Sequence, residues 1–160
     1  MGERTCLHRR GASFRLRFES SSASETQRLG KALARLLKPG DVLGLKGPLG
    51  SGKTTFVQGM ARGLGCREMP SSPTFVLAQT YHGRIPLHHL DFYRIREKEV
   101  MSIGIEDFYS DGGLTAIEWA DRAPHFVPAD RLDIVFSYRS ASRRRILLVP
   151  RGKSWKERLR

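Results

Sequence analysis

The chain has 160 residues, 39% of them hydrophobic, which suits one compact domain with its own core and leaves no room for a second catalytic domain. Its 28 Lys and Arg residues exceed its 16 Asp and Glu residues, and the resulting formal charge of +12 favours polyanionic partners such as nucleotides or RNA. No stretch approaches the roughly 18 apolar residues of a membrane span and the N-terminus lacks a signal-peptide pattern, so we expect a cytoplasmic protein with Cys6 and Cys66 as free thiols.

The first elements expected along the chain are a basic arm, a strand and a helix. Residues 1–12 are basic and patternless, whereas apolar and polar side chains alternate over residues 13–19 as in a half-buried strand. Ser24 and Gln27 have the spacing of a capping box, which predicts the start of a helix there. Pro39 and its neighbours end that helix.

A phosphate-binding motif joins the next strand to the next helix. Residues 42–46 form an apolar run typical of a buried strand, and residues 47–54 read Gly-Pro-Leu-Gly-Ser-Gly-Lys-Thr, a full match to G-x-x-x-x-G-K-[ST]. The glycines let backbone N–H groups approach a triphosphate, Lys53 adds charge for the β and γ phosphates, and the hydroxyl of Thr54 can ligate Mg²⁺. Apolar residues at helical spacing then continue to Gly65. The motif residues expected to contact the nucleotide are Gly47, Leu49, Gly50, Ser51, Gly52, Lys53 and Thr54.

The second half of the chain departs from simple alternation of strands and helices. Two strand-like runs, residues 75–81 and 85–91, are separated only by three residues, and so short a link implies an antiparallel hairpin. The elements expected after it are a short helix over 96–101, a turn over 110–113, a strand over 114–119, a hairpin of 131–138 and 145–150 around a basic turn, and a charged tail over 153–160.

Two carboxylates, Asp91 and Glu118, follow strand-like runs and so fall where a nucleotide site needs them. One would complete the Mg²⁺ shell and the other would orient the attacking water, or either could simply end its strand. Thr74 lies where many phosphate-loop proteins place a hydroxyl that senses the γ phosphate, although a mere turn is the alternative. Trp119 directly follows the second carboxylate and is expected to be core packing, with a contact surface as the alternative.

Two other polar clusters are weaker indications of a functional site. His88 and His89 are adjacent on a strand and so face opposite sides, which suits neither a zinc pair nor a catalytic dyad. The run of three arginines at 143–145, with Arg139 nearby, is typical of a solvated turn, and only its charge supports contact with RNA phosphates or an acidic partner. The chain contains no Asn, so the guanine-reading motif Asn-Lys-x-Asp cannot occur, and ATP is the expected nucleotide.

An ordered set of motifs over residues 13–152 resembles the TsaE family, also called YjeE, of small bacterial ATPases in tRNA threonylcarbamoyladenosine biosynthesis. Family members often have Asp where this chain has Pro48 and Ala where it has Ser51, and both are variable positions of the loop. The motifs are the phosphate loop with Gln58-Gly59, then Ser72-Pro73-Thr74-Phe75, His89-Leu90-Asp91-Phe92-Tyr93-Arg94, Ile103-Gly104-Ile105-Glu106 and Ile117-Glu118-Trp119.

The resemblance implies a single-domain, P-loop NTPase-like α/β fold over residues 13–152, with three layers around a mixed parallel and antiparallel sheet. It also implies Mg²⁺-dependent ATP hydrolysis that is weak without the partner proteins TsaB and TsaD. That hydrolysis would support cycling of the complex rather than the transfer chemistry, and the complex would engage tRNA.

For individual residues, the resemblance implies that Lys53 and Asp91 serve hydrolysis, that Thr55 supports the phosphates and that Thr74 responds to the γ phosphate. Glu118 would join Thr54 in the Mg²⁺ shell. Two other functions also fit a phosphate loop in this chain: a small-molecule kinase, whose lid arginines would steady the transferred group, and a binding module switched by ATP.

Overall fold

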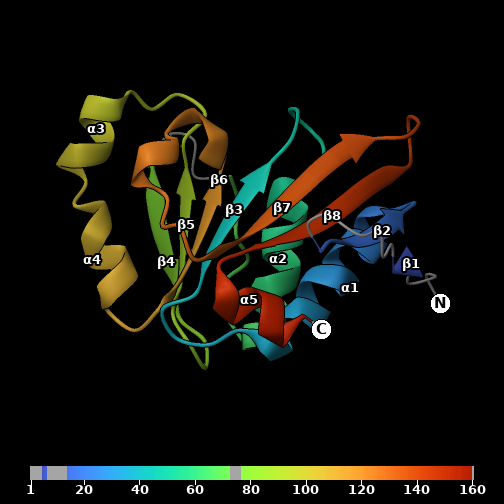
Figure 1. The fold of residues 1–160 in the computed structure, drawn as a ribbon, viewed down its shortest axis with the longest axis horizontal. Coiled ribbons are helices and arrows are strands. Elements are labelled where there is room, and N and C mark those ends of the chain that lie inside the picture. The colour runs from blue at the N-terminus through green and yellow to red at the C-terminus, as the bar shows by residue number, and fades with distance from the viewer. Residues whose placement is uncertain (1–4, 7–13, 73–76, 160) are drawn as a thin grey trace.

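A computed structural model describes residues 5–6, 14–72 and 77–159, which form a mixed sheet with helices on both faces (Figure 1). The order across the sheet is β1-β2-β8-β7-β3-β6-β5-β4. Three neighbouring pairs, β7–β3, β3–β6 and β6–β5, are parallel, and the other pairs are antiparallel. The strands are β1 (Thr5–Cys6), β2 (Leu16–Ser20), β3 (Val42–Lys46), β4 (Ala78–Tyr81), β5 (Leu87–Asp91), β6 (Leu114–Glu118), β7 (Arg131–Tyr138) and β8 (Arg144–Arg151).

Two hydrophobic clusters cover the two faces of this sheet, because side chains alternate along each strand. In β3, Leu43 and Leu45 enter one cluster and Val42 enters the other. The larger cluster packs against α1, α2 and α5, and the smaller one against α3 and α4. The α-helices are α1 (Ala23–Leu33), α2 (Lys53–Leu64), α3 (Glu97–Ser102), α4 (Ile105–Ser110) and α5 (Lys153–Arg158). The expected three-layer α/β fold is confirmed.

The helices α1 and α2 cross at close range, because glycines line their contact. A Cβ atom on Gly59 would overlap the carbonyl oxygen of Gln27 and lie 2.7 Å from its Cα. A Cβ atom on Gly30 would likewise overlap the carbonyl oxygen of Phe56, and one on Gly63 would lie 2.5 Å from the Cβ of Ala34 and 2.8 Å from the carbonyl oxygen of Lys31. This contact holds α2, which begins directly after the phosphate loop, against α1.

The predicted start of α1 is wrong by two residues. The N-cap is Ser22, whose Oγ accepts a hydrogen bond from the backbone N–H of Glu25 at 3.1 Å, while the Glu25 carboxylate accepts from the backbone N–H of Ser21 at 2.7 Å. Strand β2 stays paired with β8 up to Ser20, so the helix begins directly afterwards. The side chain of Gln27 instead donates to Gln58 across the helix contact, at 3.0 Å.

Both hairpins expected from the second half are present and antiparallel. Residues 75–76 of the first expected strand lie outside the described residues, and β5 begins at Leu87 rather than at residue 85. A helix that the sequence did not predict, α4, begins after Gly104, which has a φ of +62°. The expected charged tail instead forms α5, because Trp155 is buried in the larger cluster and Arg158 forms two hydrogen bonds with Asp41. Of the expected N-terminal arm over residues 1–12, Thr5–Cys6 pairs with β2. The rest of that arm, and residue 13 of the strand expected after it, lie outside the described residues. No helix in the described part of the chain is long and apolar enough to span a membrane.

Candidate nucleotide site

The phosphate loop connects the central strand β3 to the N-terminus of α2 and has a backbone that only glycine adopts easily. Gly47 has a φ of +147°, and a Cβ atom there would lie 2.7 Å from the carbonyl oxygen of Phe136. Gly52, the N-cap of α2, has a φ of +103°. The first turn of α2, whose N–H groups have no partner within a helix, lines the cavity at this loop, and such a helix N-terminus favours an anion.

Lys53 extends back along the inside of the loop. Its side chain is only 4% exposed, and its Nζ donates hydrogen bonds to the carbonyl oxygens of Gly47 at 2.8 Å and Pro48 at 2.9 Å. The same atom lies 4.0 Å from the ring centroid of Trp119, a distance suited to a cation–π contact. Burial lowers the pKa of Lys53, and the carboxylate of Glu118 opposes that shift.

Thr54, Glu118 and His89 form a continuous hydrogen-bonded chain. The Thr54 hydroxyl donates to Oε1 of Glu118 at 2.7 Å, and Nε2 of His89 lies 2.9 Å from the same oxygen. Because a carboxylate only accepts, Nε2 carries the hydrogen in this contact. Glu118 is 3% exposed and His89 is fully buried. The hydrogen bonds from Thr54 and His89 therefore set the orientation of the Glu118 carboxylate.

Asp91 lies beside Glu118, since the ends of β5 and β6 pair in parallel with these two residues in register. One oxygen of Asp91 accepts the backbone N–H of Tyr93 at 2.7 Å, and the other accepts the hydroxyl of Ser72 at 3.0 Å. The residue is 2% exposed. Both carboxylates therefore occupy fixed positions at the same edge of the sheet as the phosphate loop.

Most of the residues that the sequence predicted for the site line one cavity of about 220 Å³. Gly47 and Ser51 do not line this cavity. Gly47 packs against the backbone of Phe136, and Ser51 is fully buried. Thr74 lies outside the described residues. The cavity is lined by Leu49, Gly50, Gly52, Lys53, Thr54, Thr55, Ser72, Asp91, Tyr93, Glu118 and Trp119.

Two features of the site were not predicted from the residues. The first is the contact of His89 with Glu118. The sequence did contain a signal for it: His89 lies two residues before Asp91 on one strand, and alternate residues of a strand share a face. Trp119 both packs against the smaller cluster and lines the cavity, with its ring 4.8 Å from that of Tyr93. Its φ of +58° turns the chain directly after Glu118 and aims the ring at Lys53.

The oxygen atoms at this edge suit a magnesium ion shared with phosphates. Mg²⁺ prefers oxygen ligands and is usually held by one or two protein side chains together with phosphate oxygens and water. The Thr54 hydroxyl and the Glu118 carboxylate are such a pair, in mutual contact and both on the wall of the cavity. His88 belongs to another network on the opposite face, with Thr80 and Asp111.

Comparison with known proteins agrees with this geometry. The family model "Threonylcarbamoyl adenosine biosynthesis protein TsaE" matches residues 20–146. A protein named tRNA threonylcarbamoyladenosine biosynthesis protein TsaE from Bacillus subtilis is 37% identical over 141 residues, covering 88% of this chain and 89% of that protein. A protein of the same name from Treponema pallidum is 43% identical over 114 residues, covering 71% of this chain and 84% of its own.

Among solved structures, the crystal structure of Bacillus subtilis YdiB superposes with a TM-score of 0.81 at 32% sequence identity, covering 92% of this chain and 93% of that one. The range matched by the family model spans the positions of the phosphate loop and of both carboxylates, and the match in fold covers most of the chain. This chain belongs to the TsaE family.

Proposed function

We propose that this protein binds ATP with Mg²⁺ and hydrolyses it in support of tRNA threonylcarbamoyladenosine biosynthesis. The observation that carries the proposal is the contact of Thr54 with Glu118 at 2.7 Å, inside a cavity that the phosphate loop and Asp91 also line. A loop that only bound a phosphate would need neither carboxylate. Hydrolysis gives a role to each, one at the metal and one at the attacking water.

The phosphates would occupy the cavity of about 220 Å³, with the backbone N–H groups at the start of α2 directed at them. Lys53 would exchange its two loop carbonyl partners for β and γ phosphate oxygens, which are stronger acceptors because they are charged. Thr55 lies next on α2 and lines the same cavity, in a position to support the phosphates.

Thr54 and Glu118 would hold Mg²⁺, which neutralises the charge that develops on the phosphate oxygens. The hydrogen bond from His89 would hold Oε1 of Glu118 in contact with the Thr54 hydroxyl. Asp91 would accept a hydrogen bond from the attacking water, because Ser72 and the backbone of Tyr93 fix its two oxygens toward the same cavity.

The biological setting follows from the relatives, whose names assign them to tRNA threonylcarbamoyladenosine biosynthesis. We propose that the same role applies here and that TsaB- and TsaD-type proteins are the partners that accelerate turnover. Contact with tRNA would then come through the complex. The positive charge of the chain is compatible with this role but does not require direct contact with RNA.

The test is ATP turnover with and without TsaB and TsaD, together with ATP binding measured over a range of Mg²⁺ concentrations. Lys53→Ala should abolish nucleotide binding, whereas Lys31→Ala, a matched loss of one exposed lysine on α1, should leave it intact. Asp91→Asn should bind ATP and fail to hydrolyse it, while Glu118→Gln should raise the Mg²⁺ concentration needed for binding.

Three outcomes would count against the proposal. Unchanged ATP affinity in Lys53→Ala would refute the site. Transfer of the γ phosphate to a nucleoside or metabolite instead of water would favour a kinase. Negligible turnover both with and without partners would favour an ATP-switched binding module.

A further inference from the structure

Strand β7, which lies next to β3 in the sheet, contacts the phosphate loop at two points. A Cβ atom on Gly47 would lie 2.7 Å from the carbonyl oxygen of Phe136. Two residues farther along β7, the hydroxyl of Tyr138 donates a hydrogen bond to the carbonyl oxygen of Leu49 at 2.6 Å. The first half of the loop therefore lies against β7.

The hydrogen bond from Tyr138 determines how the peptide group between Leu49 and Gly50 is turned. No peptide bond in the described part of the chain is cis, and in a planar trans peptide the C=O and N–H groups point in opposite directions. Because the Leu49 carbonyl points at the Tyr138 hydroxyl, the N–H group of Gly50 points away from it. Gly50 lines the nucleotide cavity, so the direction of this N–H group matters for phosphate binding.

This peptide group has few other restraints. The side chain of Leu49 is 69% exposed, so packing does not hold it. Gly50 has a φ of +71°, and glycine reaches positive and negative φ with similar ease, so the loop itself does not fix the orientation. Within the described residues, the Tyr138 hydroxyl is the only hydrogen-bond donor to the Leu49 carbonyl.

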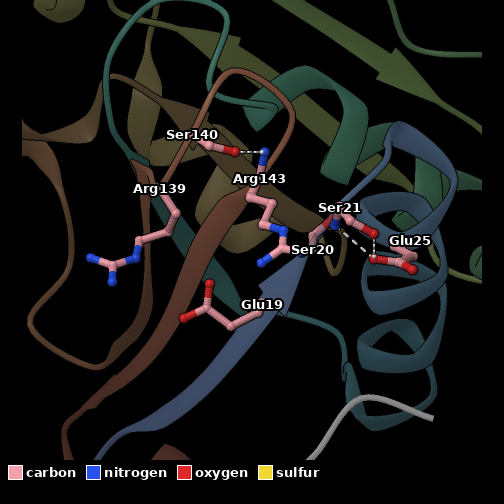
Figure 2. Close-up of a pocket in the computed structure, with 7 residues that line it drawn as sticks. All are labelled: Glu19, Ser20, Ser21, Glu25, Arg139, Ser140 and Arg143. Carbon is pink, nitrogen blue, oxygen red and sulfur yellow. Dashed lines mark hydrogen bonds between the residues drawn. The ribbon is translucent and has the colours of Figure 1, made fainter.

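Tyr138 is itself held by the hairpin of β7 and β8, independently of the phosphate loop. It pairs with Arg144 across the two strands, and the guanidinium carbon of Arg144 lies 4.4 Å from the centroid of its ring, a distance suited to a cation–π contact. The turn beyond this pair is closed by two hydrogen bonds. The N–H group of Arg139 donates to the carbonyl oxygen of Arg143 at 2.9 Å, and the N–H group of Arg143 donates to the Ser140 hydroxyl at 3.1 Å (Figure 2).

We propose that Tyr138 is a positioning residue of the nucleotide site, whose hydroxyl keeps the N–H group of Gly50 directed at the phosphates. This inference rests on the proposed function, because it assumes that phosphates occupy the cavity at the loop. The glycine of the motif permits a close approach to phosphate but does not select the direction of its N–H group. The hairpin supplies that selection through the Tyr138 hydroxyl.

The expected effect follows from the fraction of molecules whose loop is ready to bind. When that fraction falls, the apparent affinity falls by the same factor, and one hydrogen bond of this kind corresponds to about three- to tenfold. Any ligand that places phosphates at the loop is affected equally, whether or not it carries a base. A direct contact of Tyr138 with a nucleoside would instead affect only ligands that contain one.

The test compares the affinities of wild type and Tyr138→Phe for ADP and for inorganic tripolyphosphate by isothermal titration calorimetry. The substitution keeps the ring against Arg144 and removes only the hydrogen-bond donor. Both affinities should fall about three- to tenfold and by the same factor. The thermal unfolding midpoint should stay near that of wild type, because Tyr138 is 46% exposed and its hydroxyl lies at the surface.

The matched control is Tyr109→Phe, which removes a hydroxyl that donates to the carbonyl oxygen of Phe126 at 2.7 Å, in the smaller hydrophobic cluster. This control should leave both affinities unchanged. A second measurement is the NMR signal of the Gly50 N–H group in protein isotopically labelled at glycine nitrogen, identified by its absence in Gly50→Ala. The signal should shift in Tyr138→Phe and not in Tyr109→Phe, which a general loss of stability would not produce.

Wild-type affinities for both ligands in Tyr138→Phe would overturn the inference, as would an unchanged Gly50 signal. A loss confined to ADP would also overturn it and would place the Tyr138 hydroxyl at the nucleoside. If Lys53→Ala still abolishes the binding of both ligands in these cases, the proposed function stands and only the role of Tyr138 is wrong. A wild-type protein that binds neither ligand would instead overturn the proposed function, and this inference with it.

Discussion

Replacing His89 with alanine should weaken Mg²⁺ binding in the nucleotide complex without weakening the binding of nucleotide itself. Nε2 of His89 lies 2.9 Å from the Glu118 oxygen that also accepts the Thr54 hydroxyl at 2.7 Å. A hydrogen bond to a charged group contributes about 1.5–3 kcal/mol. Losing the partner that orients a metal-binding carboxylate typically lowers metal affinity about 10- to 100-fold, which agrees with that energy.

The assay is a titration of Mg²⁺ into the protein with ATP at a fixed, subsaturating concentration, with ADP binding in EDTA as the metal-free reference. His89→Ala should raise the Mg²⁺ midpoint about 10- to 100-fold and leave the reference unchanged. His89→Gln should recover part of the loss, since its amide nitrogen can replace the Nε2 donor.

The matched control is His88→Ala, because this neighbouring histidine lies on the opposite face and contacts Thr80 and Asp111 instead. Both alanine variants lose an imidazole from β5, so a general loosening of the strand would affect them equally. Equal Mg²⁺ midpoints for the two variants would refute the orienting role of His89. An equal midpoint for His89→Gln and His89→Ala would refute the importance of the Nε2 donor.

Two further predictions concern the fold that carries the site. Gly59→Ala should lower the free energy of unfolding by about 2 kcal/mol because the added Cβ would overlap the backbone of Gln27. Helix propensity alone predicts that the same substitution raises the free energy of unfolding by about 1 kcal/mol. The sign of the change, measured by urea unfolding, therefore shows whether the backbone overlap or helix propensity dominates. Asp133→Asn should cost about 3 kcal/mol near pH 7, because this carboxylate is 1% exposed and binds three cations. Burial raises the pKa of Asp133, but the hydrogen bonds from those cations outweigh it and leave the pKa below its ordinary value. A lowered folded-state pKa stabilises the fold fully above the unfolded-state value of about 3.9, and this effect is lost as the pH falls from there through the folded-state pKa. The unfolding free energies of wild type and variant should therefore begin to converge in urea unfolding below about pH 4. Persistence of the full difference at pH 3 would contradict this reasoning. The cations are Lys46, Arg131 and Arg151.

Features that depend on neighbouring residues could be predicted from the sequence. The phosphate loop, its flanking strand and helix, and both hairpins lie where short-range patterns placed them, because turn length and side-chain periodicity act over a few residues. The start of α1 could not be predicted, since the pairing of Ser20 with Arg144 in β8 determines where β2 ends. Helix α5 could not be predicted either, because most of its residues are charged and it is held by the burial of Trp155 against strands that are distant in the sequence.

By itself, the sequence determined that a phosphate loop exists and that Asp91 and Glu118 follow strands. It left open which carboxylate contacts Thr54, and the tertiary structure decided this in favour of Glu118. The physical reason is that β5, β6 and β3 are separated in the chain and become neighbours only through the parallel pairing of the sheet. A cavity of about 600 Å³ between the β2–α1 junction and the β7–β8 turn depends even more on tertiary structure, because its two walls are more than a hundred residues apart in the chain (Figure 2).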